Sequence, residues 1–284
     1  MHVKVIAGNS SPILSKRIAK ELNIPLAKVT YGKFPDGELY VRVEDRVDKA
    51  IVVQSIRCSD DIVYLMLLFD VIKEAIAVIP YMGYARQDRA FNEGEAVSIR
   101  ALAEFLESRA EKVISVNLHS REAASHFKNL IEVDAMPLIG EFYKKEKSKG
   151  TESLIMVSPD VGSLERVKVA AKIAGCEYDY LEKVRIDAEN VEIKPKNVEV
   201  EGKKVVIVDD IISTGGTIAK AAETLKAEVE AACVHAVLAS NALNKLFSAG
   251  VKKVISTDTI EQPVSKISVA KLLANAISNI YSTL

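Results

Sequence analysis

Residues 205–217, VVIVDDIISTGGT, carry the pattern that decides the fold of this chain. The apolar run at 205–208 predicts a buried strand, and two carboxylates, Asp209 and Asp210, follow where that strand ends. The turn at 213–217 is rich in hydroxyls and glycines and opens a helical pattern that reaches Leu225. A strand, a turn and a helix in this order predict one unit of a parallel α/β sheet.

The chemistry of this turn suits a phosphorylated sugar. Glycines let the backbone approach an anion closely, and the N–H groups at a helix start point toward it. The two carboxylates are well placed to accept hydrogen bonds from vicinal hydroxyls. The loop matches neither GxxxxGK[ST] nor GxGxxG. An ordinary strand–turn–helix joint with an N-cap is the alternative, but it leaves the acid pair unexplained.

The composition predicts a folded protein with a local anion site. The chain has 284 residues, of which 49% are hydrophobic and 27% are charged, so one large or two ordinary domains can form a core. A net charge of −1 argues against a broad nucleic-acid-binding surface. Three widely spaced cysteines without a CxxC pair favour a reducing compartment over a disulfide framework or a zinc site.

The ends and the apolar runs predict a cytoplasmic protein without a membrane partner. The N-terminal sequence MHVKVIAG leads straight into a strand and lacks a signal-peptide pattern. The longest apolar run, at 62–69, is too short to cross a bilayer.

Short apolar runs alternate with amphipathic patterns along the chain, which predicts an α/β fold with mainly parallel sheets. We expect strands at 3–7, 51–53, 75–79, 113–116, 154–157, 205–208 and 231–238. We expect helices at 13–22, 61–73, 98–107, 162–174, 217–226 and 241–249.

The chain also repeats itself. The sequence KVIS at 112–115 recurs at 253–256, and the strand–turn–helix pattern at 3–22 resembles that at 154–174. We therefore expect two similar domains, each with a mainly parallel sheet flanked by helices. The polar run KKEKSKG at 144–150 is typical of a solvated helix end followed by a linker. It predicts the domain boundary, with a first domain at 1–147 and a second at 148–266. The C-terminal helix within 267–284 could pack back on the first domain or on the second.

Further motifs give the chain a family resemblance. These are FPDGE at 34–38, YARQDR at 84–89, NLHS at 117–120, SPDVG at 158–162 and KVR at 183–185, beside DDIISTGGT. Each is weak by itself, but in this order over nearly the full length the chain resembles the ribose-phosphate diphosphokinase family, of the phosphoribosyltransferase-like superfamily. The resemblance implies two phosphoribosyltransferase-type domains.

The resemblance implies that ATP and ribose 5-phosphate give AMP and phosphoribosyl diphosphate for nucleotide biosynthesis. The 1-hydroxyl of the sugar attacks the β-phosphorus of ATP, and Mg²⁺, or Mn²⁺ in its place, assists the diphosphoryl transfer. Such a transfer depends on positioning and on neutralising charge.

The resemblance also assigns roles in the second half. Asp209 and Asp210 would bind the ribose hydroxyls, and Asp160 would ligate Mg²⁺. Lys183 and Arg185, in a charged loop between 178–181 and 191–193, would be catalytic and close over the triphosphate, with Arg185 also binding the sugar phosphate. The 5′-phosphate would bind at Ser213, Thr214, Gly215, Gly216 and Thr217.

The first half would supply the ATP site. His119 would be a second metal or phosphate ligand. The residues that would bind ATP are Phe34, Asp36, Gly37, Glu38, Arg86 and Gln87. In the family an adjacent subunit contributes them, which implies a homo-oligomer, at least a dimer. Without the other motifs, FPDGE is typical of a plain turn, and ARQDR of a solvated charge cluster.

Two positions depart from the family pattern. Ser163 stands where members commonly have a second glycine, and Ser213 where many have aspartate. Neither change removes a predicted catalytic group. The segment 90–98 also lacks the basic residues that many members carry, so regulation by phosphate or ADP is not implied.

Two other functions are compatible with part of the pattern. A phosphoribosyltransferase would explain DDIISTGGT but leaves FPDGE, YARQDR and the repeated first half without a purpose. A non-catalytic regulatory paralogue would be expected to lose catalytic positions, yet His119, Asp160, Lys183 and Arg185 are present.

Overall fold

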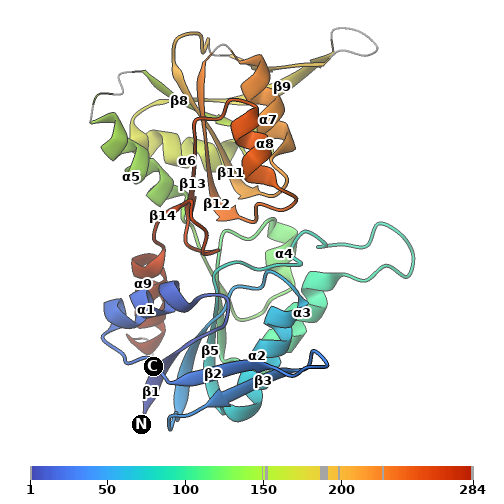
Figure 1. Ribbon diagram of the computed structural model, residues 1–284, viewed down its shortest axis with the longest axis vertical. Helices are drawn as coiled ribbons and strands as arrows, with labels where there is room; N and C mark the ends of the chain where they lie inside the picture. The colour runs from blue at the N-terminus through green and yellow to red at the C-terminus, as the bar shows by residue number, and fades with distance from the viewer. Residues whose placement is uncertain are drawn as a thin grey trace. The chain divides into compact units, whose positions relative to one another are not determined.

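The computed structural model describes residues 2–148, 150, 153–185, 191–197, 199–225 and 227–282, with the side chains at 183–185 and 191–195 outside that description. The chain forms two compact units (Figure 1). Unit 1 consists of Met1–Asp134, Thr259–Glu261 and Ser268–Leu284, and unit 2 of Ala135–Asp258 and Gln262–Ile267.

Unit 1 is built on a five-stranded sheet in which each neighbouring pair is parallel. In spatial order the strands are β1 (Val3–Ala7), β4 (Lys49–Val53), β5 (Glu74–Ile79), β6 (Lys112–Val116) and β7 (Leu130–Val133). Each residue of β4 is buried, as expected for a central parallel strand that is covered on both faces. An antiparallel hairpin, β2 (Val29–Lys33) and β3 (Leu39–Val43), stands apart from this sheet.

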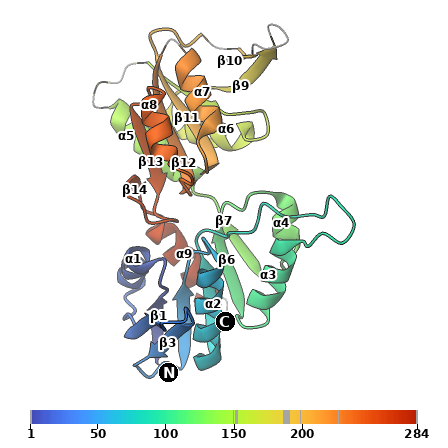
Figure 2. The same cartoon turned by 45° about the vertical axis from the view of Figure 1, so that its right-hand side comes forward.

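Helices cover both faces of the first sheet. The helices α2 (Ser59–Val71) and α3 (Ser98–Glu107) share a hydrophobic core with one face, and α1 (Pro12–Leu22) packs with α9 (Ala270–Ser282) over the other (Figure 1 and Figure 2). The short helix α4 (Arg121–Ser125) follows β6, and the hydroxyl of Ser120 caps it by accepting from the N–H of Ala123.

Unit 2 contains a seven-stranded sheet. Its order is β10 (Val191–Pro195), β9 (Glu177–Arg185), β8 (Leu154–Ser158), β11 (Lys204–Ile212), β12 (Glu228–Ala236), β13 (Lys253–Thr257) and β14 (Ser265–Ile267). The β9–β10 pair is antiparallel and the other pairs are parallel. Its helices are α5 (Met136–Lys147), α6 (Leu164–Ala174), α7 (Gly216–Thr224) and α8 (Ala242–Ser248).

The strand orders confirm the duplication that the sequence predicts. The order β1-β4-β5-β6-β7 of unit 1 matches β8-β11-β12-β13-β14 of unit 2, rank by rank along the chain. The repeated sequence KVIS opens β6 in one unit and β13 in the other, which hold the same rank. The predicted α/β fold with two similar, mainly parallel sheets flanked by helices is therefore correct.

One predicted loop is a strand. We expected Lys183 and Arg185 in a loop, but β9 continues through both residues and pairs with β10, with Lys183 opposite Ile193 and Arg185 opposite Val191. An alternating charged and apolar stretch without glycine is compatible with an antiparallel ladder at a sheet edge, which explains the difference.

The boundary between the two compact units lies before the polar run at 144–150, where the sequence predicted it. Unit 2 begins at Ala135, so α5 belongs to it and packs against α6. Gly140 permits this close contact, because a Cβ there would lie 2.4 Å from the backbone oxygen of Ala170. The C-terminal helix α9 packs on α1 and β7 in unit 1. Across the described ranges, no helix has both the length and the apolar character needed to span a bilayer.

Candidate functional site

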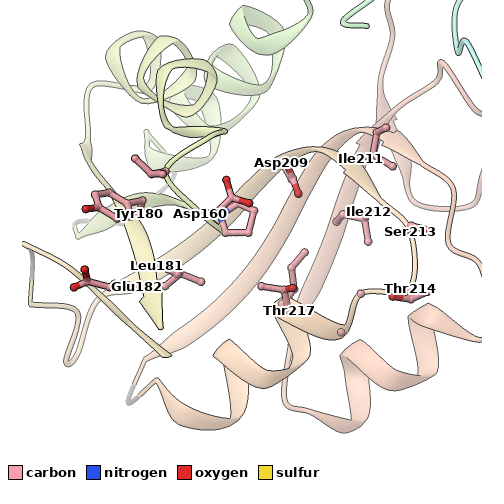
Figure 3. Close-up of a pocket in the computed structure, with 15 residues that line it drawn as sticks. Asp160, Tyr180, Leu181, Glu182, Asp209, Ile211, Ile212, Ser213, Thr214 and Thr217 are labelled. Atoms are coloured by element: carbon pink, nitrogen blue, oxygen red, sulfur yellow. The ribbon is translucent and has the colours of Figure 1, made fainter. Parts of the chain in front are cut away.

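A pocket of about 730 Å³ opens in unit 2 at the carboxyl ends of β8 and β11 (Figure 3). In parallel α/β sheets this is the edge where ligands bind. Its lining comes from three segments: the turn after β8, the middle of β9, and the stretch from the end of β11 into α7. The lining residues are Pro159, Asp160, Val161, Tyr180, Leu181, Glu182, Asp209 and residues 211–218.

The turn between β11 and α7 has the geometry of an anion cradle. Gly215 adopts a left-handed backbone conformation, with φ of 68°, and is the N-cap of α7. A side chain at Gly215 would also lie 3.0 Å from that of Leu246, which would have to shift, so the left-handed conformation above all favours glycine. Thr214, Gly216 and Thr217 are exposed and line the pocket. The first N–H groups of α7 and these hydroxyls therefore suit a phosphate group.

The two carboxylates at the end of β11 have different surroundings. Asp209 lines the pocket, and its Oδ1 accepts from the N–H of Asp210 at 2.9 Å and from the hydroxyl of Ser163 at 3.1 Å. Asp210 is buried, accepts from the guanidinium of Arg166, and is not among the residues that line the pocket. Of the predicted acid pair, Asp209 is thus the member that faces the cavity.

Burial and the neighbouring Asp210 carboxylate raise the pKa of Asp209 above its ordinary value of 3.8. The hydrogen bonds from the Asp210 N–H and the Ser163 hydroxyl oppose this rise, because they stabilise the charged form. A hydroxyl-rich ligand or a cation at the pocket would favour the ionised carboxylate further.

Asp160 lines the same pocket from the turn after β8 and lies near Asp209 (Figure 3). Its side chain is exposed, its Oδ1 accepts from the N–H of Ser163 at 3.1 Å, and its backbone oxygen accepts from the Ser158 hydroxyl. Within the described residues no group of three or more His, Cys, Asp or Glu side chains could hold a metal. The exposed Asp160 carboxylate beside the anion cradle fits Mg²⁺, which usually takes one or two carboxylates and completes its shell with water and substrate phosphates.

In unit 1 the FPDGE motif forms the tip of the β2–β3 hairpin. The N–H of Phe34 donates to the oxygen of Glu38 at 2.7 Å, and Gly37 has φ of 101°. The ring of Phe34 is 51% exposed and lies edge-on to Tyr40, with centroids 6.0 Å apart. Asp36 and Glu38 are exposed as well. The hairpin therefore offers an aromatic face and two carboxylates to solvent.

Hydrogen bonds bring the other motifs of unit 1 close to this hairpin and to each other. Lys33 in β2 reaches Asp60 in α2 at 3.3 Å, and Ser59 beside it bonds the hydroxyl of Tyr84 at 2.9 Å. Arg86 in the same loop is exposed. The adjacent Gln87 donates to Glu95 at 3.1 Å.

His119 is exposed and lies in the turn after β6, at the end of a strand as the sequence predicts. The next residue, Ser120, donates its hydroxyl to the buried carboxylate of Asp88 at 2.5 Å. This bond joins YARQDR to NLHS, a connection that the sequence pattern did not reveal.

Lys183 and Arg185 lie on β9, the strand whose residues 180–182 line the pocket. Their side chains fall outside the described part of the structure. Arg166 was not predicted as part of the site, although it lies in the first turn of α6, shortly after the SPDVG motif.

Comparison with known proteins identifies, in both halves of the chain, domains of the family that the sequence motifs resemble. The N-terminal domain of ribose phosphate pyrophosphokinase matches residues 3–109, and the phosphoribosyl transferase domain matches residues 128–269. Ribose-phosphate pyrophosphokinase 2 of Archaeoglobus fulgidus is 55% identical over 97% of this chain and 100% of its own length. The enzyme of Methanosarcina acetivorans is 41% identical over 98% of this chain and 100% of its own.

A solved structure agrees with these relatives. The crystal structure of phosphoribosylpyrophosphate synthetase from Mycobacterium smegmatis covers 100% of both chains, with 27% identity and a TM-score of 0.84. The sequence matches span the cradle of unit 2 and the motifs of unit 1 together. The chain therefore belongs to the ribose-phosphate pyrophosphokinase family.

Proposed function

We propose that this protein transfers the diphosphoryl group of ATP to the 1-hydroxyl of ribose 5-phosphate, giving phosphoribosyl diphosphate and AMP. The pocket of unit 2 carries the proposal, because a carboxylate, Asp209, and a glycine–hydroxyl cradle line the same cavity. The family match over both units favours this reaction over a phosphoribosyltransferase, which would use unit 2 alone.

The sugar phosphate would lie along the end of β11. Its 5′-phosphate would accept hydrogen bonds from the turn and the first residues of α7, and Asp209 would accept from the ribose hydroxyls. Asp210 is buried and paired with Arg166, so it would contribute to sugar binding indirectly, through its contact with Asp209. The groups that would hold the phosphate are those of Ser213, Thr214, Gly215, Gly216 and Thr217.

Asp160 would hold Mg²⁺ at the pocket, and His119 would be a second ligand for metal or phosphate. Bound Mg²⁺, or Mn²⁺ in its place, would neutralise charge on the diphosphoryl group. Lys183 and Arg185, which follow the pocket-lining part of β9, would stabilise charge on the transferring group, with Arg185 also binding the sugar phosphate.

ATP would bind at the hairpin tip and the 84–89 loop, with Phe34 against adenine. The full set is Phe34, Asp36, Gly37, Glu38, Arg86 and Gln87. We expect a neighbouring subunit to supply them, which requires a homo-oligomer. A single-chain mass by light scattering would contradict it.

The substrates and the thiols favour action in the cytoplasm. ATP and ribose 5-phosphate are intracellular metabolites, and Cys58 is an exposed free thiol, as suits a reducing compartment. No nucleic-acid or membrane partner is proposed.

Product analysis tests the reaction. The protein is incubated with Mg²⁺, ATP and ribose 5-phosphate, and in parallel with phosphoribosyl diphosphate and a purine or pyrimidine base. AMP release that needs both ribose 5-phosphate and metal supports the proposal. Nucleotide formation in the second mixture without AMP release in the first supports a phosphoribosyltransferase instead. Full turnover in excess chelator contradicts the role of the metal.

A further inference from the structure

One residue at the start of α6 donates hydrogen bonds to two carboxylates that line the pocket. Ser163, the N-cap of α6, donates its hydroxyl to Asp209 Oδ1 at 3.1 Å and its backbone N–H to Asp160 Oδ1 at 3.1 Å. Asp160 and Asp209 come from the ends of β8 and β11 and lie near each other at the pocket (Figure 3). Ser163 thus joins two strand ends that carry different parts of the site.

Arg166 extends this arrangement by one helical turn. Its guanidinium donates to the buried carboxylate of Asp210, which is next to Asp209 in β11. The N-terminal turn of α6 therefore donates hydrogen bonds to Asp160, Asp209 and Asp210. A rigid helix start can fix the orientation of these carboxylates better than a loop can.

We propose that Ser163 is a positioning residue that sets the orientation of Asp209 for the sugar hydroxyls. This proposal rests on the proposed function. The bonds from Ser163 and from the Asp210 N–H both reach Oδ1 of Asp209. These two donors hold Oδ1 and so restrain the orientation in which the carboxylate meets the ligand. Removal of the hydroxyl leaves one of the two donors, so Asp209 can rotate and binds the sugar less well.

The two bonds of Ser163 can be separated by mutation. Its backbone angles, φ −90° and ψ −3°, are ordinary for any residue, so the fold does not require serine there. Alanine keeps the N–H that bonds Asp160 but removes the hydroxyl that bonds Asp209. Threonine keeps both donors. The effect of alanine should therefore fall on the sugar phosphate and spare the metal and ATP.

The test compares Ser163→Ala and Ser163→Thr with Glu165→Ala. Glu165 is an exposed residue in the same helical turn and is outside the pocket lining. We expect Ser163→Ala to raise KM for ribose 5-phosphate by about tenfold, the usual scale for one hydrogen bond to a charged group. Its kcat, its KM for ATP and its Mg²⁺ requirement should stay within about twofold. Ser163→Thr should recover most of the loss, and Glu165→Ala should match the wild type.

The outcomes separate this proposal from the function on which it rests. Active wild-type protein with an unchanged sugar-phosphate KM in Ser163→Ala overturns the proposal alone. Equal losses in the alanine and threonine variants, or a loss in kcat with unchanged KM, overturn it as well. A wild type that neither releases AMP nor binds ribose 5-phosphate in calorimetry overturns the proposed function and this proposal with it. Thermal melting of each variant identifies a failure to fold.

Discussion

Asp209, which we propose binds the sugar hydroxyls, lowers the stability of the folded protein. Its carboxylate is close to that of Asp210 and partly removed from water, and both effects raise its pKa. The folded protein therefore holds this proton more tightly than the unfolded chain does. Stability is lost as the pH rises from 3.8, the ordinary pKa of the group, toward the raised value, because ionisation then favours the unfolded state.

We predict that Asp209→Asn stabilises the protein without ligand. An amide has no charge to repel Asp210, so the gain should be small in mild acid and reach on the order of 1 kcal/mol above neutral pH. Urea unfolding at both pH values measures it. Asp210→Asn is the matched control and should destabilise, because Arg166 would lose its charged partner. An Asp209→Asn variant that is less stable than wild type at alkaline pH would contradict the account.

Lys183 tests the proposed chemistry. Its ammonium is proposed to stabilise charge that develops during transfer, so Lys183→Ala should lower kcat by about 10²–10³ while the Kd for ATP changes far less. Single-turnover rates and nucleotide titrations separate the two effects. Lys172→Ala, an exposed lysine on α6, is the control. A variant with wild-type kcat and a raised Kd makes Lys183 a binding contact.

At the scale of elements, the sequence predicted the buried strands and the amphipathic helices well. The helix α3 has the predicted bounds, 98–107, because its apolar residues recur at helical spacing. The hairpin β2–β3 was not predicted, and of the helix α5 only its polar end at 144–147 was expected. Strand β2 has no fully buried residue and therefore little hydrophobic pattern, and the polar end of α5 resembles a linker. Their positions depend on tertiary packing that a local pattern does not contain.

The contact between α5 and α6 gives a test at this scale. We predict that Gly140→Ala destabilises unit 2 by about 1–3 kcal/mol, because the new methyl group would collide with the Ala170 oxygen. Denaturant unfolding measures the loss. Glu141→Ala, at the exposed neighbouring position, should change stability by less than about 0.5 kcal/mol. If Gly140→Ala is as stable as Glu141→Ala, the helices do not pack as described.

At the scale of the molecule, the parallel topology explains why several residues of the candidate site could be predicted to lie together. Residues at strand ends converge at one edge of a parallel sheet, so Asp160, Asp209 and the 213–217 turn had to meet. The contacts of Ser163 with Asp160 and Asp209, and of Arg166 with Asp210, were not predicted. The bond between Ser120 and Asp88 in unit 1 was not predicted either. Their roles depend on side-chain contacts between elements that are far apart in the sequence.

The central claim is that the diphosphoryl group moves intact from ATP to the sugar. Incubation with Mg²⁺, ribose 5-phosphate and ATP labelled at the β-phosphorus tests it most directly. We predict that the label appears in phosphoribosyl diphosphate and that the nucleotide product is unlabelled AMP. Labelled ADP as the nucleotide product would show transfer of a single phosphoryl group and would contradict the account.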